Sequence, residues 1–287
     1  MSYQLFFLKE NNRYIDIEEL FRFFSYSPYI TNQIKEEAVT FIYNNENIGL
    51  KASFILSKKS AIPDVYRLDP KYLDLDFRME IDPLYPNFKV GIILDIVNEL
   101  CVRFNIAIYN PLFENVSPYQ KELVLSSYEL YRDKYREKHA SLIDDMHFLS
   151  RDRLTDIFKY LYERNDLIKY YQEEKLYFPD VTFLKSRTDG RILICAKFLF
   201  DEIYVFPPKI DLILLEEANG YQKYYYADEL LSTIDKLSYE LPGFGHNTLV
   251  LQQKAVKKMK KILNRYNFSE VCDTYEEVSR DSLIDFK

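Results

Sequence analysis

Residues 73–111 carry two hydrophobic periods in succession, and this change constrains the fold more than any other feature of the chain. Apolar and polar residues alternate strictly over residues 73–82, the pattern of a strand with one buried and one exposed face. Over residues 88–104 the apolar residues recur every three or four positions, as on one helix face, with Ile96 in the middle of the stripe. A short apolar segment, 106–109, follows. The stretch therefore predicts a βαβ unit with a right-handed crossover.

The segments before this unit complete the predicted order of an N-terminal domain. Residues 3–8 and 16–24 indicate a strand and a helix. Residues 37–43 and 48–56 indicate a hairpin around the polar cluster NNEN. With the unit above, they predict the order βαβββαβ over residues 1–116. That order is typical of a ferredoxin-like α+β sandwich with an additional strand.

The rest of the chain predicts a helical linker and a second, smaller α+β domain. Two densely charged helical segments predict the linker over residues 117–176, with Ser117 and Ser150 as the expected N-caps. Beyond it, several short apolar strands and two helices predict the second domain over residues 177–287. Residues 269–287 are acidic and weakly patterned, and they predict a loosely held tail.

Charge and cysteine usage restrict the classes of partner and the compartment. The net charge of −7 argues against a nucleic-acid binder and suits a protein partner with a basic surface. The three cysteines are far apart and form no CxxC motif, which fits a reducing cytosol. No apolar run approaches the roughly 18 residues of a membrane span, and the N-terminus lacks the features of a signal peptide. The sequence thus predicts a cytoplasmic protein that binds neither nucleic acid nor membrane.

Motifs of known cofactor and catalytic sites do not occur in the sequence. There are only 6 glycines, and no P-loop, GxSxG, HExxH or EF-hand pattern is present. His246, in the loop LPGFGHN, has the chemistry of a general base, but the sequence places no serine or cysteine beside it. No cofactor is predicted.

Four carboxylates on the strand at 73–82 form the first candidate site: Asp74, Asp76, Glu80 and Asp82. The alternation predicts that they project from one face of the strand. Such a row is commonly the exposed face of a half-covered sheet. It would also serve as a recognition surface for a basic partner. A third interpretation is acid–base or Mg²⁺ chemistry by paired carboxylates.

The segment HASLIDDMH provides the second candidate site, a metal set of His139, Asp144, Asp145 and His147. Two imidazoles and two carboxylates would ligate a metal ion if a turn brought them together. Their spacing matches no standard metal motif. The alternative is an exposed connection between the two helices.

Three segments are similar to parts of uncharacterised two-domain bacterial proteins: residues 75–111, FPDVTFL at 178–184 and PPKIDLILL at 207–215. Those proteins have a strand–Pro–helix–strand unit and a helical link. These are followed by a P-x-[VI]-x-F strand and a P-x-[VI]-D-x-[VI] strand. Some of them resemble immunity proteins of bacterial toxin systems. The resemblance implies a cytosolic bacterial protein whose role is to bind another protein.

The functional prediction is therefore a non-enzymatic, immunity-type protein-binding module. Its basis is the negative charge, the 26 tyrosines, a residue type common at interfaces, and the lack of a catalytic motif. The alternative is an enzyme with an unrecognised site. That site would use the carboxylates at 74–82 or the His139–His147 segment, with or without a metal ion.

Overall fold

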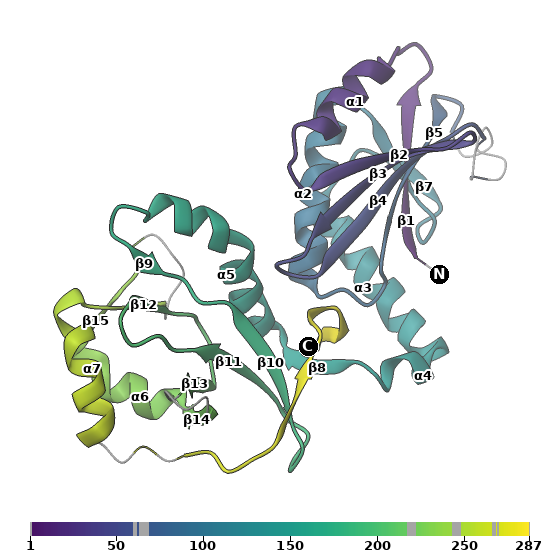
Figure 1. Cartoon of the computed structure of the whole chain (residues 1–287). Coiled ribbons are helices and arrows are strands. Elements are labelled where there is room, and N and C mark those ends of the chain that lie inside the picture. The colour runs from purple at the N-terminus through teal and green to yellow at the C-terminus, as the bar shows by residue number, and fades with distance from the viewer. Residues whose placement is uncertain are drawn as a thin grey trace. The chain divides into compact units, whose positions relative to one another are not determined.

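The structure is a computed structural model that describes residues 2–59, 62, 69–216, 222–242, 248–265, 268 and 270–286 (Figure 1). The side chains of Lys260, Asn264 and Phe286 are also outside the description. The protein is a mixed α+β protein, as the sequence predicts. It divides into two compact units, Met1–Met146 and His147–Lys287.

The predicted helical linker, residues 117–176, spans the boundary between these units. Helices α3 (Lys121–Lys138) and α4 (Ala140–Ile143) belong to the first unit, and α5 (Arg151–Tyr170) belongs to the second. Ser150 is the N-cap residue of α5, as predicted, whereas Gln120 and not Ser117 precedes α3.

The first unit contains a seven-stranded sheet in the order β2-β3-β4-β5-β1-β6-β7 among the described residues. The strands are β1 (Tyr3–Glu10), β2 (Ile30–Ile34), β3 (Ala38–Asn45), β4 (Leu50–Ser57), β5 (Tyr72–Ile81), β6 (Ala107–Asn110) and β7 (Asn115–Ser117). Strand β1 pairs antiparallel with both β5 and β6, so β5 and β6 run in the same direction on either side of it. Helix α2 (Asn87–Phe104) connects them.

Two strands at the edges of this sheet, β2 and β7, were not predicted. Four of the five residues of β2 are exposed, so it shows no alternation of apolar and polar residues. Strand β7 has only 3 residues. The sheet is thus wider than the sequence indicates, and the ferredoxin-like assignment stays a prediction.

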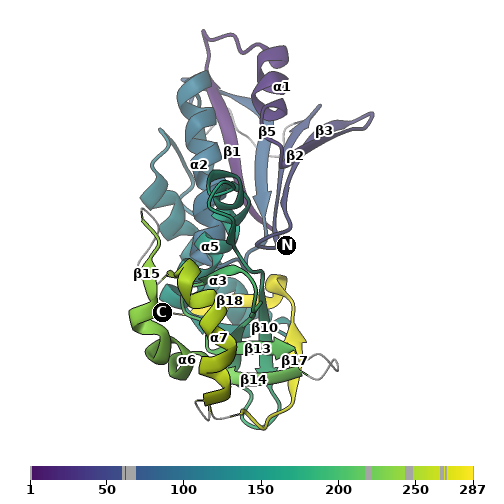
Figure 2. The same ribbon diagram turned by 60° about the vertical axis from the view of Figure 1, so that its left-hand side comes forward.

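One core of the first unit lies on one face of the sheet, where side chains of neighbouring strands form continuous rows, and a separate buried cluster contains Phe6, Leu8 and Ile62. Phe41, Phe54, Met79 and Leu5 are directly paired across four strands, and each is at most 1% exposed. Helices α1 (Ile17–Ser25), α2 and α3 pack on this face (Figure 2). Helix α2 contributes most of its apolar stripe, namely Val90, Ile93, Leu94, Val97, Leu100 and Cys101.

A β-bulge in β5 breaks the alternation predicted for residues 73–82. Phe77 pairs with Phe7, but the next residue of β1, Leu8, pairs with Asp74. The extra residues include Asp76, whose φ of 54° is left-handed. Phe77, Met79 and Ile81 are buried as predicted, whereas Leu73, before the bulge, is 47% exposed. The bulge also interrupts the predicted row of carboxylates, so Asp74, Asp76, Glu80 and Asp82 do not lie on one regular strand face.

The predicted position of Ile96 in the buried stripe is also wrong. Ile96 is half-buried, while Ile93 and Val97 are fully buried. Several neighbouring helix residues are apolar, so the sequence does not determine which of them lies at the centre of the buried stripe. An error of one residue rotates the predicted face by about 100°. The packing on the sheet selects Ile93 and Val97.

The second unit contains three sheets among its described residues. Their strand orders are β14-β13-β11-β10-β17, β15-β16-β12-β9 and β18-β8. The strands are β8 (His147–Ser150), β9 (Leu176–Tyr177), β10 (Val181–Ser186), β11 (Ile192–Lys197), β12 (Ile203–Phe206), β13 (Leu212–Glu216), β14 (Gln222–Tyr226), β15 (Ser238–Glu240), β16 (Leu249–Leu251), β17 (Tyr275–Val278) and β18 (Leu283–Phe286). Helices α6 (Ala227–Ile234) and α7 (Gln253–Arg265) contribute to a core cluster that also contains Phe198, Tyr204 and Phe206.

The residues described at 270–286 are not a loosely held tail, so this prediction is wrong. Strand β17 pairs with β10, and β18 pairs in parallel with β8. Leu283 and Ile284 are fully buried, and Asp285 is 1% exposed, 3.4 Å from the guanidinium of Arg151. The partners of these strands lie far away along the chain, so local composition does not reveal the pairing.

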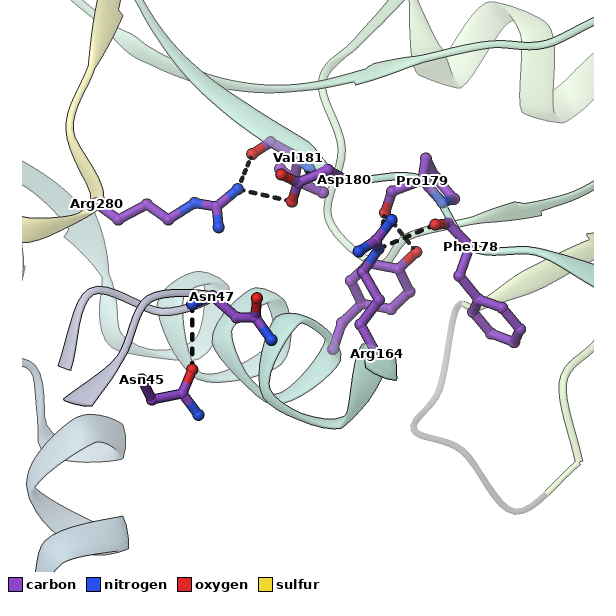
Figure 3. Close-up of polar contacts among 9 residues, drawn as sticks. Asn45, Asn47, Arg164, Phe178, Pro179, Asp180, Val181 and Arg280 are labelled. Atoms are coloured by element: carbon purple, nitrogen blue, oxygen red, sulfur yellow. Dashed lines mark hydrogen bonds and ion pairs between the residues drawn. The ribbon is translucent and has the colours of Figure 1, made fainter. Parts of the chain in front are cut away.

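The FPDV segment that begins β10 is held from two sides (Figure 3). Arg164 of α5 donates hydrogen bonds to the carbonyl oxygens of Phe178 and Pro179, at 2.9 and 3.0 Å. From the C-terminal segment, Arg280 donates to Asp180 Oδ1 and to the Val181 carbonyl, both at 2.7 Å. These contacts give the segment a structural role.

Candidate functional site

The carboxylates of β5 do not form a single row. Asp74 accepts a hydrogen bond from the backbone N–H of Asp76 across the bulge, at 3.0 Å. Burial, together with the charge of Asp74, raises the pKa of Asp76. Asp82 lies beyond the end of β5 and accepts from the N–H of Leu84 at 2.7 Å, as in a turn. Asp74 and Asp82 thus have local backbone roles, and Asp76 lies in the bulge.

Glu80, the fourth predicted carboxylate, is the acceptor in a small polar network. Its Oε1 lies 2.7 Å from Arg78 Nε and 3.0 Å from Gln4 Nε2. The Glu80 side chain is 23% exposed. Arg78 therefore compensates the negative charge of Glu80.

The predicted metal residues do not assemble either. His139 caps the end of α3, where its ring packs on Tyr135 with centroids 4.4 Å apart. Asp144 and Asp145 follow α4, and His147 begins β8 in the second unit. No group of three His, Cys, Asp or Glu side chains that could hold a metal ion occurs among the described residues, which include these four. His246 lies outside the described residues.

A pocket of about 540 Å³ lies on one face of the five-stranded sheet of the second unit. Direct pairing places Ser186 and Tyr275 on this face, and Leu193 and Tyr226 share it. Among the described residues, five carboxylates and one guanidinium line the pocket: Asp189, Asp211, Asp228, Glu270, Asp273 and Arg191. We call it the Asp273 pocket.

Two segments that are distant in sequence meet at the pocket. The turn between β10 and β11 contains Gly190, whose φ of +74° is left-handed, and whose N–H donates to the carbonyl of Ser186. Arg187 N donates to the Thr274 carbonyl at 3.0 Å, which joins this turn to the segment before β17. The pairing of β10 with β17 therefore builds the site.

Asp273 lies at the junction of these segments. It accepts hydrogen bonds from the hydroxyls of Ser186 and Thr188, at 2.6 and 2.7 Å, and these bonds lower its pKa. The pKa of Asp189 is also lowered, first by the backbone N–H of Arg191. A lowered pKa means that the charge is lost only when the pH falls through that lower value. Both carboxylates therefore stay negative in mildly acidic solution.

Asp211, the acidic residue of the PPKIDLILL segment, is engaged in the fold. It accepts from the N–H of Ile194 at 2.7 Å and forms an ion pair with Arg153 of α5. Glu270 is held less closely than Asp211. Its Oε2 lies 3.8 Å from Lys223 Nζ, and both side chains are substantially exposed. Asp189 forms an ion pair with Arg191, so the carboxylates available to a ligand are Asp228, Glu270 and Asp273.

Tyrosine side chains complete the lining. Tyr275 contacts Tyr224 edge to face, with ring centroids 4.9 Å apart. Burial raises the pKa of Tyr275 to about 12, so its hydroxyl is neutral. That hydroxyl is buried and has no hydrogen-bond partner within the described part of the chain. Carboxylates beside aromatic rings attract ammonium and guanidinium groups.

Sequence reasoning missed this site because its residues come from separate segments. The pattern Thr188-Asp189-Gly190 is typical of a turn, and residues 269–287 are acidic. Neither observation indicates that the two segments lie side by side. The signal that would have found the site is the pairing of β10 with β17.

No protein family matches this chain, and no curated protein and no solved structure matches it. The resemblance to two-domain bacterial proteins therefore has no support beyond the three segments. None of the helices in the described part of the chain is long and apolar enough to cross a membrane.

Only one cysteine should react rapidly with a thiol reagent such as DTNB in the native protein. Cys272, which lines the pocket, is exposed. Cys101 and Cys195 are buried, and desolvation raises the pKa of each to about 12, so almost no thiolate forms at neutral pH. Absorbance should report one fast equivalent in native protein and 3 after denaturation. A second fast equivalent would mean that a core cysteine is accessible.

Proposed function

We propose that this chain is a non-enzymatic protein-binding module, and that the Asp273 pocket receives lysine or arginine side chains of a basic partner. The observation that carries the proposal is the lining of this pocket, where Asp228, Glu270 and Asp273 remain available beside tyrosine rings after Asp189 pairs with Arg191 and Asp211 with Arg153. A cation in such a pocket gains Coulomb attraction, charge-assisted hydrogen bonds and contact with aromatic faces.

The charge of the whole chain supports the same class of partner. With a net charge of −7, the protein attracts a basic partner over a distance of about one Debye length before contact. The pocket then provides the specific contacts, because the carboxylate of Asp273 is held by two hydroxyl donors before binding. Groups that are already positioned lose little entropy on binding.

The proposal extends to the biological role suggested by the sequence. A basic toxin is one kind of partner that an immunity-type protein of the bacterial cytosol would bind. The pocket supports only the basic character of the partner. A toxin gene next to the gene for this chain would support the immunity role, and its absence in every genome that carries the gene would count against it.

Substitution of Asp273 by asparagine should weaken the binding of a basic peptide. The probe is fluorescein-labelled octalysine, measured by fluorescence anisotropy at low ionic strength. Asp273→Asn keeps the shape of the side chain and removes one negative charge, so we expect the dissociation constant to rise about tenfold.

The matched control is Asp74→Asn, which removes the same charge from the first unit. It should change the dissociation constant by less than about twofold, because Asp74 does not line the pocket. Equal losses for the two variants would mean that octalysine responds to net charge alone. A larger loss for Asp74→Asn would move the recognition surface to β5. Failure of octalysine to bind the unmodified protein would refute the proposal.

A further inference from the structure

Strand β2 is an open edge of the sheet in the first unit. Among the described residues its hydrogen-bonded neighbour is β3 alone, and Figure 2 shows β2 at the margin of the sheet. Proteins commonly protect such edges with proline, charged residues or a bulge. The sequence of β2, ITNQI, contains no proline and no charge, and its register with β3 is regular. Ile34 is 71% exposed.

The hydrogen bonds to β3 determine which groups face the open edge. The carbonyl of Tyr29 accepts from Asn44 N at 2.8 Å, and Lys35 N donates to the Ala38 carbonyl at 2.9 Å. In an antiparallel ladder, alternate residues bond to the same neighbour. Residues 29, 31, 33 and 35 therefore face β3, and residues 30, 32 and 34 direct their backbone groups outward. Ile30 N is already bonded to the Ser27 carbonyl.

We propose that two copies of this chain associate by antiparallel pairing of β2 with β2, centred on Asn32. In this register, each Asn32 exchanges both backbone hydrogen bonds with the Asn32 of the second copy. The free N–H of Ile34 meets the free carbonyl of the second copy's Ile30. The outward N–H of Ile30 takes no part in this pairing, because it already donates to the Ser27 carbonyl of its own chain. Four backbone hydrogen bonds thus join the two edges, and in this register the carbonyl of each Ile34 receives no donor from the second copy.

The side chains of the strand fit the same register. Ile30 lies opposite the second copy's Ile34, and Thr31 lies opposite Gln33, so apolar residues meet apolar ones and polar meet polar. Lys35 lies opposite Tyr29 and not opposite another cation. Because ITNQI carries no charge, two chains with a net charge of −7 each meet at this edge without a like-charge pair. The uncharged edge and the match of Ile30 with Ile34 favour a second copy of the chain as the occupant.

Sedimentation velocity over a concentration series tests the pairing. The unmodified protein should shift from monomer to dimer as its concentration rises. Ile34→Lys places an ammonium opposite Ile30 of the second copy and should raise the dimer dissociation constant at least about tenfold. The matched control is Val102→Lys on α2, since Val102 is 74% exposed and lies on another element. It should leave the constant unchanged.

Disulfide trapping tests the register. Each variant for this test also carries Cys272→Ser, which removes the exposed thiol of the natural sequence. In a hydrogen-bonded antiparallel pair the Cα atoms are about 5.5 Å apart, within disulfide range, so Asn32→Cys should form a covalent dimer on mild oxidation. Lys35→Cys should not, because its two copies would lie about 20 Å apart along the strands. A monomer at every concentration, or equal trapping at both positions, would overturn the proposal.

Discussion

Replacement of Phe24 by alanine should lower the free energy of unfolding by about 3–5 kcal/mol. Phe24 is the residue through which α1 joins the core of the first unit, and it is 1% exposed. Its ring stacks on Phe41 with centroids 4.4 Å apart and planes 17° from parallel, and it lies 5.0 Å from Phe54. Alanine would remove these contacts and leave a cavity between α1 and the sheet.

Chemical denaturation followed by circular dichroism and tyrosine fluorescence measures this loss, since the chain has no tryptophan. The control is Tyr26→Ala, just beyond α1, where the side chain is 78% exposed. It should cost less than about 0.5 kcal/mol. Similar losses for the two variants would contradict the packing of α1 on β3 and β4.

Replacement of Ile284 by alanine should cost about 2–5 kcal/mol, although the residue lies near the C-terminal end of an acidic segment. Ile284 is fully buried in β18, where it pairs with Phe148 of β8. The loss reflects both the missing methyl groups and the cavity, which the parallel pairing of β8 and β18 prevents from closing.

The control for Ile284 is Asp281→Asn, three residues earlier, where the residue is exposed. It should change the free energy of unfolding by less than about 0.5 kcal/mol. This pair of variants separates two accounts of the C-terminal segment. A tail that is loosely held would give a loss near zero for both, and such a result would refute the docking of β18.

Local hydrophobic patterns correctly predicted those elements in which every residue of one face is buried in the core. The alternation of Phe77, Met79 and Ile81 is one example, because an entire strand face meets the core. The same pattern failed at Leu73, because the bulge arises from the pairing of β5 with β1 and not from β5 alone. Strands β2 and β18 were missed for a related reason. Strand β2 is mostly exposed and so has no buried face, and β18 forms only by pairing with β8, more than 100 residues away in the sequence.

The site was less predictable than the fold. Sequence reasoning selected carboxylates that are close along the chain, and the structure assigns Asp74 and Asp82 to turns and Glu80 to Arg78. The pocket instead joins Asp189 to Asp273, whose proximity depends on the pairing of β10 with β17. Single-sequence patterns carry no information on such pairing.

Carbodiimide coupling of octalysine to the protein tests the central proposal most directly, because it reports which carboxylates contact the bound cations. The reagent joins a lysine amine to a neighbouring carboxylate, and peptide mapping by mass spectrometry identifies the residue. We predict that the coupled carboxylates are concentrated at Asp228, Glu270 and Asp273. Coupling confined to other residues, with these three unmodified at a peptide concentration that saturates the anisotropy, would contradict the assignment of the pocket.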